Sequence, residues 1–290
     1  MAPSGTFDDV TKTPPSPPTS PSSPVADDEI YARTYDALNI GWHGELAAYL
    51  EWARASARDD GRPKVLELGS GSGRVAQPLA DAGCEVTGVD VSATMLGVAR
   101  SRADGTNPRY VLGDARTFAL DERFDLAIIP AHSFQFMLTS DDQHACLRNV
   151  RRHLRKGGWL VVHVEAPAPD WPAGLPVDPP APEARSLGAA LLDAPNGVIW
   201  RRRFAWTYDP MTEVATLHSD WMCTKPDGTT ELVPHPPIGI KVVGQAEMEH
   251  ALQRARFAIR ELRVGFERDV ETGDDRERVW VAQRAGTKGS

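Results

Sequence analysis

The central part of the chain, residues 64–165, alternates short apolar runs with longer segments in which apolar residues recur at helical spacing. Apolar runs bounded by turn residues are typical of strands buried on both faces, and strands that alternate with helices form parallel sheets with right-handed crossovers. The expected strands are residues 65–68, 85–90, 110–112 and 124–130, and a fifth that ends at Glu165. The pattern therefore predicts an α/β fold with a doubly wound, mostly parallel sheet.

Two different kinds of sequence precede this region. Residues 1–26 are rich in Pro and Ser, a composition that cannot bury a core, so we expect a disordered tail. In residues 27–60, aromatic side chains that include Tyr31 and Tyr35 follow each other at roughly helical spacing. This segment predicts one or two helices in front of the sheet.

The alternation stops after strand five. Residues 166–186 are rich in Pro and predict an irregular loop over the carboxyl edge of the sheet. The segments that follow predict strands at 198–208 and 213–223, with turns at 209–212 and 226–228. These strands form an antiparallel layer, inserted as part of residues 166–240. Residues 241–284 then predict a helix and two closing strands.

The composition limits what the chain can bind. Its 290 residues, 41% of them hydrophobic, suffice for one large domain with an insertion. No apolar run approaches the roughly 20 residues of a membrane helix, so no membrane partner is expected. The net charge of −8 argues against nucleic acid as a partner, because binding to its backbone needs a basic surface.

The three cysteines, Cys84, Cys146 and Cys223, lie far apart in the sequence. This spacing disfavours a disulfide framework and a structural zinc site, and no metal is expected. The start of the chain lacks the pattern of a secretory signal. We therefore expect a reduced, cytoplasmic location, with Cys84 and Cys146 as core residues.

A glycine-rich turn follows the first strand. Val65-Leu66-Glu67-Leu68 ends in Gly69, Gly71 and Gly73, after which a helical pattern begins. Glycines let a ligand approach the backbone, and the helix start offers free N–H groups, so a small ligand is expected here. The dinucleotide fingerprint would need a glycine at Arg74, which disfavours a nicotinamide cofactor. Glu67 suits a ligand with an ammonium group.

Two acidic residues follow at the ends of the next strands. Asp90 ends the second strand, at the position where ribose hydroxyls are held in related sheets. Ser92 then fits the N-cap of a helix. Asp114 follows the third strand in Gly113-Asp114-Ala115. Each feature alone is compatible with an ordinary turn or cap, but their joint spacing favours one ligand site.

This ordered set resembles the class I S-adenosylmethionine-dependent methyltransferases, and the resemblance extends through Pro130 to the Gly157-Gly158 turn before strand five. It implies a Rossmann-like, seven-stranded methyltransferase fold with S-adenosylmethionine as the cofactor. Met95 would contact the adenine, Asp114 its amino group, and Arg74 the methionine carboxylate. The expected cofactor-binding residues are Glu67, Gly69, Ser70, Gly71, Arg74, Asp90, Val91, Met95, Gly113, Asp114, Ala115 and Pro130. In the same terms, the domains are a tail (1–26), lid helices (27–60), a cofactor-binding core (61–165), an insertion (166–240) and the closing elements (241–284).

The resemblance leaves the catalytic base to be found at the carboxyl edge of the sheet. Glu165 ends strand five in an apolar segment, where desolvation would favour a base, and it is the first candidate. His132, which follows strand four, is the second. His163 lies on the same side of strand five as Glu165, and we expect it to be a packed sheet histidine.

The methyl acceptor is open among several classes. N- or O-methylation of a small metabolite is the family's commonest use and comes first. C-methylation of an alkene such as geranyl diphosphate would use cations, aromatic faces and Glu165. A cofactor-binding partner protein without catalysis is a further alternative. The candidate pocket residues are Tyr31, Tyr35, Phe134, Phe136, Trp200, Arg202 and Trp206. The insertion would either cover the acceptor or form the contact between the subunits of a homo-oligomer.

Overall fold

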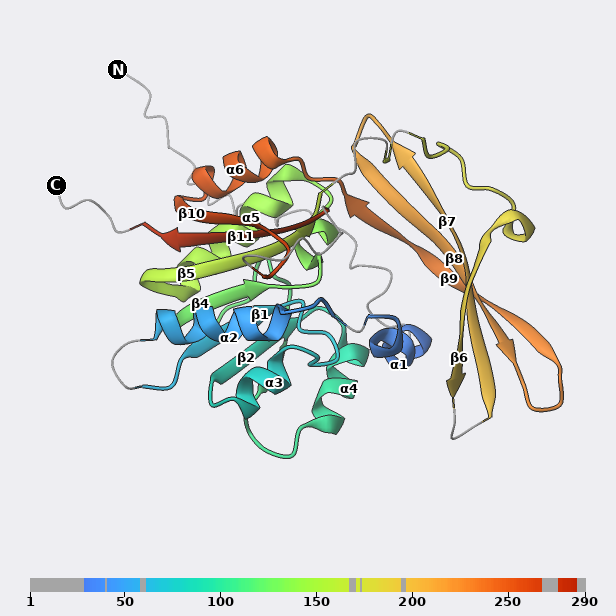
Figure 1. Ribbon diagram of the computed structural model, residues 1–290, viewed down its shortest axis with the longest axis horizontal. Helices are drawn as coiled ribbons and strands as arrows, with labels where there is room; N and C mark the ends of the chain where they lie inside the picture. Colours follow the sequence, from blue (N-terminus) through green and yellow to red (C-terminus); the bar gives the residue numbers. More distant parts are fainter. Residues whose placement is uncertain are drawn as a thin grey trace, which may run out of the picture.

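The computed structural model describes residues 29–39, 41–57, 61–166, 171–172, 174–193, 197–267 and 276–285. Two sheets dominate the described residues, one of seven strands and one of four. Figure 1 shows the larger sheet between layers of helices, with the smaller sheet beside it. The expected tail, residues 1–26, lies outside the described residues.

The larger sheet has the strand order β10-β11-β5-β4-β1-β2-β3. All its pairings are parallel except those of β11 with β10 and β5. The strands are β1 (Lys64–Leu68), β2 (Glu85–Asp90), β3 (Arg109–Leu112), β4 (Phe124–Ile129), β5 (Leu154–Glu165), β10 (Phe257–Val264) and β11 (Glu277–Arg284). The central strand β4 is buried along its whole length, as expected for a parallel strand covered on both faces. The predicted doubly wound fold is confirmed.

Each face of this sheet has its own hydrophobic core. On one face, α5 (Ser140–His153) and α6 (Gln245–Arg254) bury Leu147, Val150 and Leu252. On the other face, α2 (Glu45–Ser56), α3 (Ala76–Asp81) and α4 (Ala93–Arg102) bury Tyr49, Trp52, Leu79 and Leu96. Cys84 and Cys146 lie in these cores, as expected. None of the described helices is long and apolar enough to cross a membrane.

The insertion folds into an antiparallel sheet in the order β6-β7-β8-β9, which we call the insertion sheet. Its strands are β6 (Ser186–Asp193), β7 (Val198–Asp209), β8 (Val214–Thr224) and β9 (Thr230–Lys241). The first helix, α1 (Glu29–Leu38), lies between this sheet and the core domain (Figure 1). A 3₁₀ turn after β4, η1 (Ser133–Phe136), contacts β9 near its last residue, Lys241.

Local differences from the sequence expectations have simple causes. The irregular loop expected up to residue 186 ends where β6 begins, at Ser186, and its last described part contains a 3₁₀ turn, η2 (Pro182–Ala184). β6 pairs only with β7 and shows no alternation of apolar and polar residues, so the sequence carried no strand signal there. Gly157 and Gly158, expected in a turn before strand five, lie within β5, which begins at Leu154, and the pairing of β5 with β4 shifts register across them.

Candidate active site

The glycine loop, residues 69–73, joins β1 to α3 and turns back on itself. Gly69, Gly71 and Gly73 all have positive φ, at 69°, 51° and 81°. A Cβ on Gly69 would lie 2.5 Å from Ser133 Oγ, so the loop after β4 presses directly on this glycine. Only glycine combines this φ with the close approach.

Asp90 organises the loop from the end of β2. One of its carboxylate oxygens accepts a hydrogen bond from the backbone N–H of Gly71, and the other accepts from that of Ser92, each at 2.8 Å. Ser92 in turn caps α4 by accepting from the N–H of Met95, as expected. Burial raises the pKa of Asp90 despite these hydrogen bonds. The carboxylate keeps lone pairs for further donors.

Glu67 is a buried acid without enough donors. It is 1% exposed, and its Oε2 has no hydrogen-bond partner among the described residues. Burial raises the pKa of Glu67 well above its ordinary value. A buried acceptor without a donor indicates a missing group, and a ligand ammonium would fit.

Arg74 makes a different contact from the one expected. Its guanidinium forms two hydrogen bonds to the carboxylate of Glu45 on α2, of 2.6 and 3.1 Å, and lies 5.8 Å from the Trp42 ring. Arg74 is therefore already paired in this structure, and its contact with a ligand carboxylate stays a prediction.

Apolar side chains surround Asp90 and the glycine loop. Val91 is 41% exposed and Leu112, the register partner of Asp90, is 57% exposed. Met95 reaches the loop, since its Cε lies 3.0 Å from a Cβ built on Gly71. Exposed apolar groups at the ends of neighbouring strands favour a flat ligand ring.

Asp114 is held by the arginine that follows it along the chain. Burial alone would raise the pKa of Asp114, but hydrogen bonds from Arg116 outweigh this and lower it. The side chain remains 31% exposed beside Gly113 and Ala115. Asp114 is thus an ionised hydrogen-bond acceptor just after β3.

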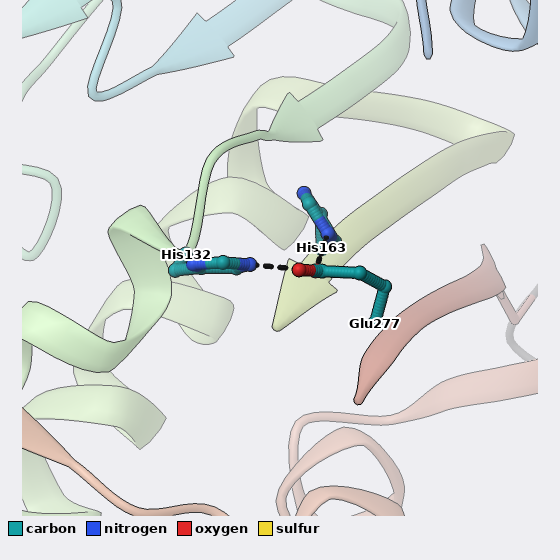
Figure 2. Close-up of side chains that lie close together, drawn as sticks. All are labelled: His132, His163 and Glu277. Carbon is teal, nitrogen blue, oxygen red and sulfur yellow. Dashed lines mark hydrogen bonds and ion pairs between the residues drawn. The ribbon is translucent and has the colours of Figure 1, made fainter. Parts of the chain in front are cut away.

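Three side chains from distant parts of the chain form a second centre, the carboxylate–histidine cluster of His132, His163 and Glu277 (Figure 2). The Nε2 atoms of His132 and His163 lie 2.7 and 2.5 Å from the same oxygen, Oε2 of Glu277. Trp42 donates to the other oxygen at 2.9 Å. His132 directly follows Pro130-Ala131, and both Ala131 and His132 have positive φ, at 51° and 60°. Such strained backbone persists where surrounding contacts enforce it.

The pKa values of Glu277 and His163 are both lowered within the cluster. Burial alone would raise the pKa of Glu277, but hydrogen bonds from His132 and His163 outweigh it and hold the pKa well below its ordinary value. Burial also lowers the pKa of His163. An ionised carboxylate accepts a hydrogen bond from the Nε2–H group of a histidine. A neutral imidazole that donates from Nε2 leaves its Nδ1 as an acceptor.

Glu165 lies outside this cluster. Its carboxylate forms an ion pair with Arg276 at 3.0 Å, and Gln135 holds its backbone N–H at 2.8 Å. The expectation of apolar surroundings is wrong, because a cation of the segment before β11 faces the carboxylate. His163 is fully buried, as expected, but it is a member of the cluster and not only a packed residue.

Two residues of this centre, Glu277 and Trp42, were not predicted from the sequence. A closing strand that pairs antiparallel with strand five brings its first residues to the carboxyl edge, and Glu277 is the register partner of Glu165. An acid directly before an apolar strand was therefore the available signal for Glu277. Trp42 carried no comparable signal, since only the fold brings it to this edge.

The expected acceptor residues lie on three elements, η1, α1 and β7. Phe134 is fully buried in the core beneath α5, so it has a packing role, whereas Phe136 is 42% exposed. Tyr31 and Tyr35 are in contact on α1, with ring centroids 5.5 Å apart, and burial raises the pKa of Tyr35 to about 12. The remaining residues, Trp200, Arg202 and Trp206, share one face of β7.

Comparison with known proteins agrees with this geometry. Residues 65–158, which hold the glycine loop, Asp90, Asp114 and His132, match a family model described as a methyltransferase domain. These residues form a methyltransferase domain. The methyltransferase domain also contains four neighbouring strands of the larger sheet, β4, β1, β2 and β3.

Two relatives of known name each match less than half of the chain. The putative methyltransferase YqeM of Bacillus subtilis is 30% identical over 138 residues, 47% of this chain and 54% of YqeM. The cypemycin N-terminal methyltransferase of a Streptomyces species is 31% identical over 122 residues, 42% of this chain and 49% of that protein. The chain spans about half the length of these curated relatives.

A solved structure matches over nearly the whole chain. The CcbJ methyltransferase from Streptomyces caelestis is 26% identical and superimposes with a TM-score of 0.68, covering 92% of this chain and 100% of CcbJ. The larger sheet therefore has the Rossmann-like methyltransferase fold that the motifs implied.

Proposed function

We propose that the chain is an S-adenosylmethionine-dependent methyltransferase that methylates an amine of a small metabolite in secondary metabolism. The observation that carries the proposal is the pairing of His132 with Glu277 at the carboxyl edge of the sheet, next to the glycine loop. The name of the cypemycin N-terminal methyltransferase, which describes methylation at an N-terminus, supports an amine as the acceptor.

The residues of the cofactor region fit S-adenosylmethionine. Glu67 offers a buried carboxylate oxygen without a donor to the cofactor's ammonium group. Asp90 would accept the ribose hydroxyls, and the exposed Val91 and Leu112 would contact the adenine ring. When bound, the cofactor supplies a sulfonium methyl group that is displaced in line by a nucleophile.

An amine nucleophile must first lose a proton, because the protonated form has no lone pair. With Nε2–H of His132 held by Glu277, Nδ1 of His132 is the nitrogen that can accept this proton. His163 and Trp42 hold the same carboxylate and so fix its position. The protein thereby orients a base. Holding the amine close to the methyl donor would account for much of the rate of methyl transfer.

The alkene alternative has weaker support. It would rely on Glu165 as the base, and the structure pairs that carboxylate with Arg276. Of the three consecutive arginines of β7 that could hold a diphosphate, residues 201–203, Arg203 is paired with Asp220. A partner protein without catalysis would not need an oriented histidine base, although it remains an outcome of the test below.

The test combines cofactor binding with methyl transfer. Labelled S-adenosylmethionine is incubated with amino sugars, free amino acids, short peptides and geranyl diphosphate, and calorimetry measures the affinity for S-adenosylhomocysteine. We expect methylation of an amine, with kcat lowered roughly 100-fold in His132→Ala and nearly unchanged in Glu165→Gln, at constant cofactor affinity. Loss of turnover only in Glu165→Gln would favour the alkene, and tight cofactor binding without any turnover would favour the partner protein.

A further inference from the structure

One face of the insertion sheet carries polar groups that lack partners. Arg202 on β7 is the register partner of Trp221 on β8, and Phe204 is that of Ser219. Residues directly opposite each other and residues two apart on a strand share a face, so these four side chains are neighbours. The rings of Phe204 and Trp221 lie 5.8 and 5.9 Å from the guanidinium carbon of Arg202.

This face is connected to the methyltransferase domain through α1, which lies between the two (Figure 1). The ring of Tyr31 on α1 packs on that of His235 on β9, with ring centroids 5.8 Å apart, and Tyr31 lies close enough to Arg202 to influence its pKa. Tyr31 also contacts Tyr35, which lies close enough to Asp90 for that carboxylate to raise its pKa. The face therefore continues toward the cofactor region.

The three consecutive arginines of β7 have different surroundings. Arg201 is exposed, whereas Arg203, on the same face as Arg201, shares the carboxylate of Asp220 with Arg185. Arg202 points to the other face and forms no ion pair or hydrogen bond with any described residue. A partly buried guanidinium without a counter-charge is costly, which indicates that a ligand supplies one.

Two buried residues beside Arg202, Trp221 and Ser219, each have a polar atom without a hydrogen-bond partner among the described residues. Trp221 is 0% exposed and its indole Nε1 makes no hydrogen bond within the described structure. Ser219 is 4% exposed and its Oγ is equally unpartnered there. A guanidinium and an indole N–H can only donate, so their common partner must be rich in acceptor oxygens.

We propose that the methyl acceptor carries an anionic oxygen group, a carboxylate or a phosphate, which binds Arg202, Trp221 and Ser219. The inference rests on the proposed function and names a substrate class for it, namely amines that bear such an anion. The planar guanidinium matches both groups, because each offers two oxygens to its fork of N–H donors.

The insertion sheet is connected to the turn that follows the base, so such an anion would also help to orient the amine. The side chain of Gln135, in the turn after His132, donates to the carbonyl oxygens of Glu165 and Lys241, at 3.1 and 3.0 Å. These two residues end β5 and β9, at the two ends of the insertion. One side chain therefore connects the sheet that carries Arg202 to the turn that follows His132.

The test follows the indole N–H of Trp221 by NMR during titration of the full chain with inorganic phosphate and, separately, with acetate, at constant ionic strength. Its signal is assigned with Trp221→Phe. We expect a saturable shift with at least one anion, an apparent Kd raised at least about tenfold in Arg202→Gln, and no change in Arg201→Gln. The anion that binds more tightly identifies phosphate or carboxylate.

Two results would overturn the inference: no saturable shift with either anion, or the same affinity in Arg202→Gln as in Arg201→Gln. Unchanged indole signals from Trp52 in each variant show that the fold is intact, and Arg202→Lys, which keeps the charge, should recover part of the affinity. Because this readout requires no turnover, anion binding without methylation would contradict only the proposed function. Methylation without anion binding would contradict only the inference.

Discussion

Two carboxylates at the site, those of Asp90 and Glu277, have pKa values that are shifted in opposite directions. Asp90 receives two backbone N–H bonds, yet burial dominates and raises its pKa. Glu277 receives hydrogen bonds from two histidines, which outweigh burial and lower its pKa. Glu277 is thus held as an anion, whereas Asp90, under the proposed function, would accept hydrogen bonds from neutral hydroxyl groups.

Removing the Asp90 carboxylate should weaken binding of the cofactor. Asp90→Ala is expected to lower the affinity for S-adenosylhomocysteine by about 1–3 kcal/mol, because hydrogen bonds to a charged acceptor are lost. Calorimetry measures this directly, and Asp104→Ala, a change at an exposed acid, serves as the control. An unchanged affinity in a folded Asp90→Ala protein would refute the ribose assignment.

Replacing Glu277 should destabilise the protein in a pH-dependent way. The pKa of Glu277 is lower in the folded chain than its ordinary value of 4.5, so its ionised form stabilises the fold above that pH. This stabilisation is lost as the pH falls toward the folded-state pKa. Glu277→Gln should therefore cost about 3 kcal/mol at pH 7, and less as the pH falls below the ordinary value.

Urea denaturation from neutral to acidic pH checks this expectation, with Glu183→Gln, a change at an exposed glutamate, as the matched control. A loss of stability in Glu277→Gln that stayed constant over the whole pH range would show that the carboxylate's charge is not what stabilises the cluster.

At the scale of elements, the features that could be predicted from the sequence are those that a local pattern of residues determines. The buried run of β4 and the cap of α4 by Ser92 were visible because their signals lie within a few residues. β6 was not, since its edge position imposes no alternation. The cluster of His132, His163 and Glu277 joins residues up to 145 positions apart, and such contacts leave no local signal.

The start of α5 offers a test of one such local signal. Thr139 caps this helix, its hydroxyl accepting from the N–H of Asp142 at 3.1 Å. Thr139→Ala should lower the free energy of unfolding by about 1 kcal/mol, whereas Thr139→Ser keeps the acceptor and should change it little. Thermal or urea unfolding distinguishes the two, and equal losses in both variants would rule out the cap as the cause.

At the scale of the whole molecule, the described part of the chain forms one methyltransferase core with one added sheet. Residues 1–26 lie outside the described residues, and their composition predicts no contribution to either. A protein that begins at Ala26 should keep its melting temperature within about 1 °C and its turnover. A large decrease of either would show that the tail contacts the folded part.

The two hydrogen bonds donated by the Gln135 side chain bear on how proteins of this fold diversify. One amide group holds both the end of β5 and the end of β9, so the chain leaves and rejoins the core at a single point. A segment of different length or shape can be exchanged between these two ends without changing any pairing within the larger sheet. Under the proposed function, natural variation and laboratory grafting of this segment would change which acceptor is recognised and leave the residues that bind the methyl donor unchanged.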